Sequence, residues 1–479
     1  MVSTSIANDG DTKSGAVEAS IKLPTGLMFA APQGGGGGST AALRSQPRIS
    51  QFLSYVSSGE FAAGDWTCSL NGDRTVATCI VDDLDPKQTA ALELAVVIDT
   101  FGLSEDAKTV FHVEAGDVNA TYEAPTGLES TDDNLNIAFA ARGGVAATTV
   151  GAPLMGCDLA TATCQTAMLS TKSTAANNSQ KMIPLNRNGG ERNSATTRLN
   201  LPAGANVLYA ALEWSANANV KDALRPQAVV DDFVPGTNDY TDDYKATWFD
   251  APLTSARIKA PGAADWTDID GAVVSPVYLD SSKRAYYQSR ANVTELGRQY
   301  GDGDWSVADI ALARATEDRD QTYYGGFALT VIYEAPGLPT ARVAMFDGSR
   351  WVSQSASAEF SFYTGSTSAV DMSWVAWDSD RNNVGDSATI DGTALMPMRW
   401  DGRVGKYISK DSDPSILGKT NDAADATAAG SAFSNSLGVD AKSFFPHADL
   451  AAGKHTLRAT SSGDNYLLSS VTVTVTSAN

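Results

Sequence analysis

The chain has few of the residues, and none of the long apolar runs, on which several classes of protein depend. Its 479 residues include three histidines and four cysteines, and 35 Lys plus Arg stand against 56 Asp plus Glu, for a formal charge of −21 at pH 7. Nucleic-acid binding needs a basic surface that displaces counterions from phosphate, so this charge excludes that class. No stretch approaches the ~18 to 20 apolar residues of a membrane-spanning helix. The opening MVSTSIANDGDTKSG has neither the basic start nor the apolar stretch of a signal peptide.

The motifs of common hydrolases are also missing. The sequence contains no GxSxG nucleophile elbow and no HExxH zinc motif. His112, His447 and His455 lack the neighbours of a catalytic triad or a metal site, so we expect them to have structural roles. We predict that the chain is not an enzyme.

The composition that remains is typical of a β protein. Hydrophobic residues make up 43% and charged residues 19%, enough to build cores, and short alternating segments are separated by turn residues. The clearest strands are predicted at 207–214, 327–333, 358–363 and 471–476. In residues 471–476 three valines alternate with three threonines, which predicts one buried face and one solvent-exposed face.

Two segments carry helical signals. Residues 86–99 (PKQTAALELAVVID) fit an amphipathic helix or a strand, and periodicity alone does not decide between them. Residues 291–300 predict one short helix, with Asn292 or Thr294 as its cap and Gly301 as its stop.

The cysteines fall into two close pairs, Cys68 with Cys79 and Cys157 with Cys164. Two metal sites are the competing interpretation, but neither pair has CxxC spacing and histidines are scarce. We therefore predict two local disulfides and an oxidising, extracellular setting.

The N-terminal segments SIANDGD, EASIKLPTGLMF, GDWTC and RTVATCIVDDLDPKQTAALELAVVID follow one another in a characteristic order. Over about residues 2–125 the chain resembles the domain of unknown function eleven, an immunoglobulin-like repeat of bacterial envelope and secreted proteins. The resemblance implies that Trp66 fills the space between two sheets and that Cys68 and Cys79 join strands across a hairpin turn at Asn71, Gly72 and Asp73. It also implies a strand within 86–99.

From about residue 150 a second set of segments includes MGCDLATATC, TRLNLPAGANVLYAALEW, GGFALTVIYEAPGLPTARVAMFDG, WDSDRNNVGDSATIDG and HTLRATSSGDNYLLSSVTVTV. This part resembles an uncharacterised module that accompanies such repeats in adhesin-like bacterial proteins. The expected fold is all-β: an immunoglobulin-like sandwich at 1–128, a linker or connecting strand at 129–149, and a jelly-roll-type β-sandwich at 150–479, either single or divided near 350.

One loop carries the pattern of a cation site. Asp378, Asp380, Asn382 and Asp386 place oxygen-bearing side chains at alternating positions, so a curled loop could direct them at one calcium ion. The loop is not an EF-hand, because the sixth position is Asn383 and the twelfth is Thr389. The alternative is an acidic turn whose side chains bond their own backbone.

The sequence offers two further candidate sites. A Lys-to-Asn isopeptide bond would suit a surface sandwich, with Lys22 as the lysine. The second is a sugar-stacking platform, for which the candidate tryptophans also have core packing as the commoner role: Trp248, Trp266, Trp374, Trp377 and Trp400.

Together these features favour a non-enzymatic extracellular structural or adhesive protein that forms a fibre or surface layer. Its expected partners are copies of itself, other envelope proteins, or a host or cell-surface glycan or protein; nucleic acid is not among them, and calcium is the one cofactor considered. The alternatives are a carbohydrate-binding or glycoside-processing secreted protein and a viral or secretion-apparatus fibre component.

Overall fold

The computed structural model describes residues 2–24, 27–29, 60–72, 74–94, 96–98, 108–126, 136–186, 191–218, 246–249, 251–274, 278–279, 285–315, 323–364, 368–408, 422–451 and 453–477. Within these ranges all the strand pairs are antiparallel, and there are two short α-helices, α1 (Ala162–Leu169) and α3 (Thr294–Tyr300). The predicted all-β class is confirmed in its coarser form, since the described chain is mostly β-strand. No helix in the described residues is long and apolar enough to cross a membrane.

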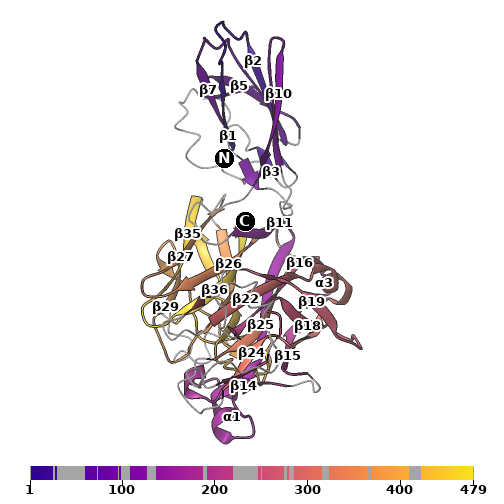
Figure 1. Cartoon of the computed structure of the whole chain (residues 1–479), viewed down its shortest axis with the longest axis vertical. Coiled ribbons are helices and arrows are strands. Elements are labelled where there is room, and N and C mark those ends of the chain that lie inside the picture. The colour runs from indigo at the N-terminus through magenta and orange to yellow at the C-terminus, as the bar shows by residue number, and fades with distance from the viewer. Residues whose placement is uncertain are drawn as a thin grey trace.

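The first ten strands form sheets of their own, drawn in indigo and purple at one end of the molecule (Figure 1). They make a six-stranded sheet of order β10-β9-β2-β6-β5-β4 and two strand pairs, β1-β7 and β3-β8. Their bounds are β1 (Val2–Ala7), β2 (Val17–Lys22), β3 (Leu27–Phe29), β4 (Phe61–Ala63), β5 (Trp66–Leu70), β6 (Val76–Val81), β7 (Thr89–Leu94), β8 (Val96–Ile98), β9 (Lys108–Ala115) and β10 (Val118–Pro125).

The core of this N-terminal unit centres on Trp66, as the resemblance implied. Its indole is buried and donates a 3.1 Å hydrogen bond to the carbonyl of Ala91 on β7, so it spans the space between two sheets. Cys68 and Cys79 lie directly opposite each other on β5 and β6 and are disulfide-bonded. The segment 86–99 contains β7 and β8, so its strand interpretation is confirmed.

The rest of the described chain forms the body, which contains two six-stranded sheets. The first, called the E sheet here, has the order β12-β25-β16-β22-β20 with β21 also paired to β22; the second, the D sheet, has the order β11-β26-β36-β28-β33 with β34 also paired to β28. The strands of the E sheet are β12 (Val145–Pro153), β16 (Asn206–Ala218), β20 (Ala272–Val273), β21 (Tyr278–Leu279), β22 (Ala285–Asn292) and β25 (Gly325–Glu334). Those of the D sheet are β11 (Asn136–Gly143), β26 (Ala341–Val352), β28 (Ser368–Trp377), β33 (Val439–Ser443), β34 (His447–Leu450) and β36 (Tyr466–Ser477).

Two four-stranded sheets cover the outer faces of this pair. The G sheet comprises β15 (Ser194–Leu199), β23 (Gly303–Ala308), β18 (Ser255–Lys259) and β19 (Thr267–Asp270), and the J sheet comprises β27 (Ala358–Thr364), β35 (Gly453–Ser461), β29 (Asp386–Ile390) and β30 (Thr393–Ala394). Three short pairs complete the body: β13 (Met155–Gly156) with β14 (Ile183–Pro184), β17 (Ala246–Phe249) with β24 (Leu312–Ala315), and β31 (Trp400–Asp401) with β32 (Lys406–Tyr407).

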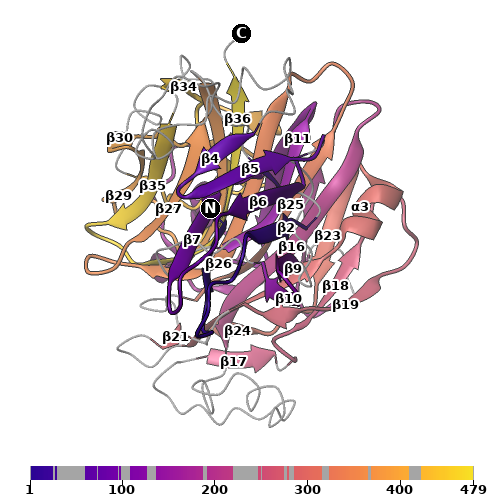
Figure 2. The same ribbon diagram turned by 90° about the horizontal axis from the view of Figure 1, so that it is seen from above.

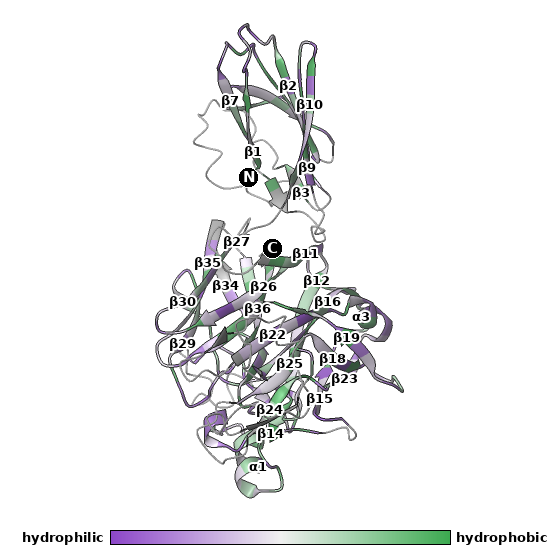
Figure 3. Ribbon diagram, in the orientation of Figure 1, coloured by the Kyte–Doolittle hydropathy of each residue, from purple (hydrophilic) through white to green (hydrophobic). Residues whose placement is uncertain are grey.

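The buried side chains give the order of the layers as G, E, D and J. One core contains residues of the G and E sheets, a second contains residues of D and J, and two smaller clusters join E to D. Seen from above, the J strands lie on one side of the body and the G strands on the other (Figure 2), and the hydropathy colouring shows apolar residues along the inner strands (Figure 3). The body is thus two sandwich-like pairs of sheets packed back to back.

This layering corrects the expectation for residues 471–476. The strand is confirmed as part of β36, but Thr472 and Thr474 are buried as well as Val471 and Val473. Strand β36 is central in the D sheet, so the J sheet covers its valine face and the E sheet covers its threonine face. Toward the end of the strand both faces become partly exposed, at Val475 and at Thr476.

The other predicted elements have close counterparts. Residues 207–214, 327–333 and 358–363 fall within β16, β25 and β27. Helix α3 begins at Thr294, whose backbone N–H donates 3.0 Å to Oδ1 of Asn292, and it ends before Gly301 at a positive φ of 55°. The expected linker at 129–149 contains β11 and the start of β12, which belong to the body sheets; residues 129–135 lie outside the described residues.

Candidate functional site

The loop predicted to bind calcium connects β28 of the D sheet to β29 of the J sheet. It begins at Asp378, which adopts a left-handed φ of 61°, and ends at Gly385, whose φ is 136°. Its end is fixed against the β35–β36 turn, because the backbone N–H of Ser462 donates 3.0 Å to the carbonyl of Gly385 and the Asn383 amide donates 3.1 Å to the carbonyl of Gly463.

Three of the four predicted ligands are buried and one is not. Asp378, Asp380 and Asp386 are each at most 9% exposed, whereas Asn382 is exposed to solvent. A fourth buried carboxylate comes from the facing turn: Asp464 lies close enough to the other three for their charges to raise its pKa. The structure therefore brings together Asp378, Asp380, Asp386 and Asp464, without Asn382.

These carboxyls have perturbed acidities because they are buried beside one another. Burial, reinforced by the other aspartates, raises the pKa of Asp464 to about 9, and burial raises the pKa of Asp386 to about 8 and that of Asp380 to about 6. Both carboxylate oxygens of Asp386 lack a hydrogen-bond partner. The neighbouring Ser461 hydroxyl donates its proton to the carbonyl of Asp464 instead, at 2.6 Å. At neutral pH, Asp386 and Asp464 therefore hold protons.

The described residues contain no group of three or more His, Cys, Asp or Glu side chains arranged to hold a metal ion. The four carboxylates are neighbours, but they do not form a ready-made coordination sphere. Calcium binding at this loop stays a prediction, and it would require the side chains to move toward a common point.

Next to this loop is a network of buried ion pairs that the sequence did not reveal. Arg399 joins two aspartates, with Nε 2.6 Å from Oδ2 of Asp425 and Nη2 3.0 Å from Oδ2 of Asp422. The ammonium of Lys442 contacts Asp425 and lies 2.8 Å from Oδ1 of Asp440. The fully buried guanidinium of Arg381 donates hydrogen bonds to two backbone carbonyls, at 3.0 Å to that of Asp425 and at 2.8 Å to that of Ser434.

The loop and the network together bury more acidic than basic groups. Seven aspartates, each at most 9% exposed, share the region with three basic side chains, an excess of four carboxyls: Asp378, Asp380, Asp386, Asp422, Asp425, Asp440 and Asp464, with Arg381, Arg399 and Lys442. Four uncompensated charges in a dry core would be very costly. The raised pKa values of Asp386 and Asp464 reduce that cost by protonation at neutral pH, and Asp380 joins them below about pH 6.

The segment that supplies Asp422 and Asp425 runs from residue 422 to 438 and is almost wholly buried without being a regular strand. It is made largely of Ala, Ser and Gly, and a Cβ at Gly430 would lie 2.4 Å from the hydroxyl oxygen of Thr197. Small residues let this segment pass between packed layers, where its carbonyls accept hydrogen bonds from two strands. The backbone N–H of Gly151 on β12 donates to the carbonyl of Ala429, and that of Arg198 on β15 donates to the carbonyl of Gly430.

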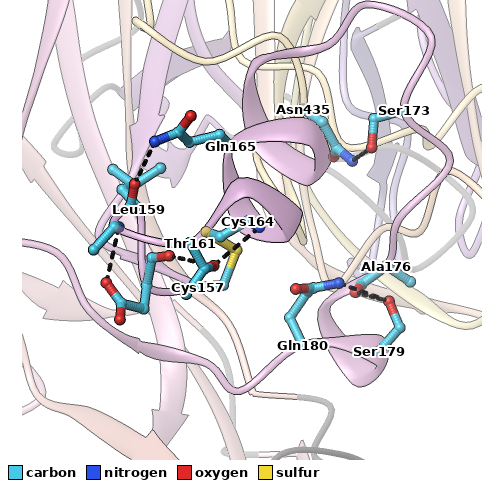
Figure 4. The surroundings of a disulfide bond; sticks show 12 residues. Cys157, Leu159, Thr161, Cys164, Gln165, Ser173, Ala176, Ser179, Gln180 and Asn435 are labelled. Atoms are coloured by element: carbon cyan, nitrogen blue, oxygen red, sulfur yellow. Dashed lines mark hydrogen bonds between the residues drawn. A yellow bond between two sulfur atoms is a disulfide. The ribbon is translucent and has the colours of Figure 1, made fainter.

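The second disulfide lies at the far end of the body. Cys157 is bonded to Cys164 in the first turn of α1, a helix that the sequence did not predict (Figure 4). Thr161 caps the helix by accepting 3.2 Å from the backbone N–H of Cys164. Both predicted pairs are thus disulfides, which favours an oxidising compartment.

The remaining candidates have structural surroundings. Lys22 is exposed, so it is wrong as the buried lysine of an isopeptide bond. His455 is buried and pairs with Asp391 at 2.6 Å, and His112 bonds Thr121 on the neighbouring strand at 2.8 Å.

Among the five tryptophans considered for sugar stacking, Trp374, Trp377 and Trp400 are buried and Trp266 is partly exposed. The side chain of Trp248 lies outside the description.

Comparison with known proteins adds no identification. No protein-family model matches the chain, and no curated protein matches it. A solved structure described as "Complete structure of manganese lipoxygenase of Gaeumannomyces graminis and partial structure of zonadhesin of Komagataella pastoris" aligns over 72% of this chain and 80% of that one, at 11% identity and a TM-score of 0.13. A score this low carries no argument about fold or function.

Proposed function

We propose that the chain is a non-enzymatic extracellular structural or adhesive protein, whose sheets form a rigid scaffold and whose N-terminal unit offers a strand edge for association. We further propose that the N-terminal unit is an immunoglobulin-like sandwich, as the resemblance implies, and that the body is two jelly-roll-type sandwiches. Support for the second assignment comes from the sheets, since residues 145–334 supply the E and G sheets and residues 341–477, joined by β11, supply D and J.

The observation that carries the proposal is the open edge at β10. β10 pairs only with β9 among the described strands, so no described strand bonds the backbone groups on its outer side. Tyr122 of β10 lies opposite Phe111 of β9, and Phe111 in turn lies opposite the buried Ile21 of β2. The three side chains therefore share one face of the sheet. Val118 aligns in the same way with the buried Val17. The apolar inner face of the sheet therefore continues onto β10, where Val118 is 68% and Tyr122 is 67% exposed.

An edge of this kind suits strand addition by a copy of the chain or by another envelope protein. Backbone hydrogen bonds would supply affinity, and the uncovered Val118 and Tyr122 would supply apolar area. In the body, large aromatic side chains pack between the sheets: Trp214, Trp305, Trp374 and Trp377 are fully buried.

Native mass spectrometry and electron microscopy of the purified chain, in calcium and in chelator, test this proposal. We expect oligomers, fibres or a lattice at micromolar concentration. A strictly monomeric protein that binds no cell surface, glycan or matrix protein would contradict it.

One observation favours a second candidate, carbohydrate binding. The partly exposed Trp266 borders an open hollow of about 470 Å³ on the G sheet, lined also by Arg257, Lys259 and Asp265. The Arg257 guanidinium lies 5.6 Å from the centroid of the Trp266 ring. An aromatic face among polar groups is typical of sugar sites. Glycan-array binding that is lost in Trp266→Ala would support this candidate, and an absence of binding by the wild type would remove it.

A further inference from the structure

A lysine and two aspartates are enclosed together in the network beside the calcium loop. Asp440 and Lys442 alternate along β33 and so project to the same side of the strand, and Asp425 comes from the buried segment 422–438 that runs beside it. The Lys442 Nζ contacts Oδ1 of Asp425 and lies 2.8 Å from Oδ1 of Asp440. All three side chains have no exposure to solvent.

The surroundings hold this group in place and keep it dry. Arg399 donates from Nε to the other oxygen of Asp425, Oδ2, at 2.6 Å. Asp440 is fixed by the backbone N–H of Thr427, which donates to its Oδ1 at 2.9 Å. The ring of Trp374 lies over the lysine, with its centroid 6.0 Å from Nζ. An amine is thus held against a carboxylate oxygen of Asp425, with the carboxyl of Asp440 and the guanidinium of Arg399 as the neighbouring groups.

We propose that Lys442 and Asp425 condense to form an intramolecular isopeptide bond, with Asp440 as the proton carrier and Arg399 as the charge stabiliser. Asp440 takes a proton from the Nζ ammonium and passes it to an oxygen of the Asp425 carboxylate, and the free amine attacks Cγ of the neutral carboxyl. Arg399 stabilises the tetrahedral oxyanion. The C–N bond forms, the bond from Cγ to one carboxyl oxygen breaks, and that oxygen leaves as water with two protons that originate on Nζ. The step consumes no oxidant or other co-reactant.

Two physical arguments support this reaction over a permanent ion pair. Holding amine and carboxyl in contact replaces a bimolecular encounter, an advantage that reaches effective molarities of about 10⁵ M or more in well-oriented systems. Amide formation also removes one positive and one negative charge from a dry core, and so removes the cost of keeping them desolvated. Arg381 and Arg399 then remain opposite Asp422 and Asp440, so the charge balance is unchanged.

The acidity of Asp440 fits its part. Burial raises the pKa of Asp440, an effect that the nearby Asp425 strengthens and Lys442 opposes. A carboxyl with a raised pKa is a better proton acceptor than an ordinary aspartate, and it can return the proton to the leaving oxygen.

The bond would tie the segment 422–438 covalently to β33 of the D sheet. This inference goes beyond the proposed function and does not depend on it, since the bond can form whether or not the chain is adhesive.

Intact-mass spectrometry of the purified wild type, after disulfide reduction, tests the inference directly. We expect a mass below that of the sequence by one water. Trypsin should fail to cut after Lys442, so that the peptide 420–442 is replaced by a looped peptide 420–454 lacking one water, while cleavage after Lys454 proceeds normally. Cleavage at Phe433 by a second protease should leave two fragments still joined.

An unmodified mass together with an ordinary 420–442 peptide would overturn the inference. So would a loss of water that fragmentation places within an aspartate alone, as in a succinimide. The wild-type result decides the question even if a variant fails to fold.

Three variants then assign the roles. Lys442→Arg should have the full mass of its sequence, because the nucleophile is gone. Asp440→Asn should do so as well, since the amide cannot accept the lysine proton. Asp425→Asn should still form the bond by losing ammonia in place of water, and so reach the same final mass as the wild type. Circular dichroism confirms that each variant is folded. If Asp440→Asn cross-links as completely as the wild type, Asp440 is not the proton carrier.

Discussion

The Glu213 carboxylate on β16 accepts a 2.6 Å hydrogen bond from the hydroxyl of Ser469 on β36, deep between the E and D sheets. A β-bulge in β36 places Ser469 for this contact. Val375 of β28 lies opposite Ser470, but the next residue, Ala376, lies opposite Leu468, so Ser469 has no partner on β28. Ser469 is the extra residue, and the bulge lets the adjacent Ser470 bond the same carboxylate at 2.8 Å. The two halves of the body are thus joined by a buried polar contact as well as by apolar packing.

Removing this carboxylate should destabilise the body. Glu213→Ala would leave two buried hydroxyls without their acceptor and open a cavity, so we expect the free energy of unfolding to fall by about 2 to 4 kcal/mol. Urea unfolding measures the change. Glu334→Ala, at an exposed residue of β25, is the matched control and should change it by less than about 0.5 kcal/mol. Equal effects in the two variants would contradict a special role for Glu213.

The buried aspartates predict that stability falls as pH rises. Burial raises the pKa of Asp380 to about 6, of Asp386 to about 8 and of Asp464 to about 9. The unfolded chain has ordinary carboxyls, so between about pH 4 and pH 9 the folded state binds more protons and the free energy of unfolding decreases with pH, by about 1.4 kcal/mol per unit for each such group. The stabilisation is fully present below the unfolded pKa and is lost as the pH passes each folded value.

Urea unfolding at pH 5, 7 and 9 measures this slope. Asp386→Asn should reduce it between pH 5 and pH 8, whereas Asp117→Asn, in the exposed β9–β10 turn, should not. A stability that rises with pH over this range would contradict the protonated cluster.

Calcium competes with these protons for the same oxygens, so the same titration tests the calcium prediction made from the sequence. Bound calcium would flatten the slope of stability against pH, and chelator would restore it.

The disulfide between Cys68 and Cys79 should stabilise the N-terminal unit locally. It joins residues 11 apart in the sequence, and closing so short a loop is worth roughly 2 to 3 kcal/mol in the chain-entropy model. Replacing both cysteines with serine should accelerate amide hydrogen exchange in β5 and β6 and leave exchange in β16 and β25 unchanged. Faster exchange throughout the body would show that the two parts unfold together.

Much of the fold could be predicted from local pattern. Alternation and turn residues identified the strands at 207–214, 327–333 and 358–363, and cysteine spacing identified both disulfides. The layering could not be predicted this way. A central strand covered on both sides can carry hydroxyl side chains inward when they pair across the interface, as Ser373 of β28 does with Thr149 of β12 at 2.9 Å.

The candidate site was found only in part, for a related reason. Alternating Asp residues drew attention to 378–386, but Asp464 is 78 residues beyond the end of that loop and nothing local marks it as a neighbour. The segment 422–438 gives no local sign of burial, because eight of its 17 residues are Asp, Ser, Asn or Gly, which are common in turns. Only the packed layers show that its aspartates are buried beside Arg399 and Lys442.

Sedimentation velocity of the wild type and two single variants tests the scaffold-and-assembly account most directly. Tyr122→Lys places a charge on the uncovered face at β10, and Ile80→Lys places the same charge at a 48%-exposed residue whose register partner is Glu18, on the opposite face of the same sheet. The account predicts concentration-dependent association of the wild type, association at least tenfold weaker in Tyr122→Lys, and no change in Ile80→Lys. Wild-type protein that stays monomeric at every concentration and captures no surface partner, or equal loss of association in both variants, would contradict it.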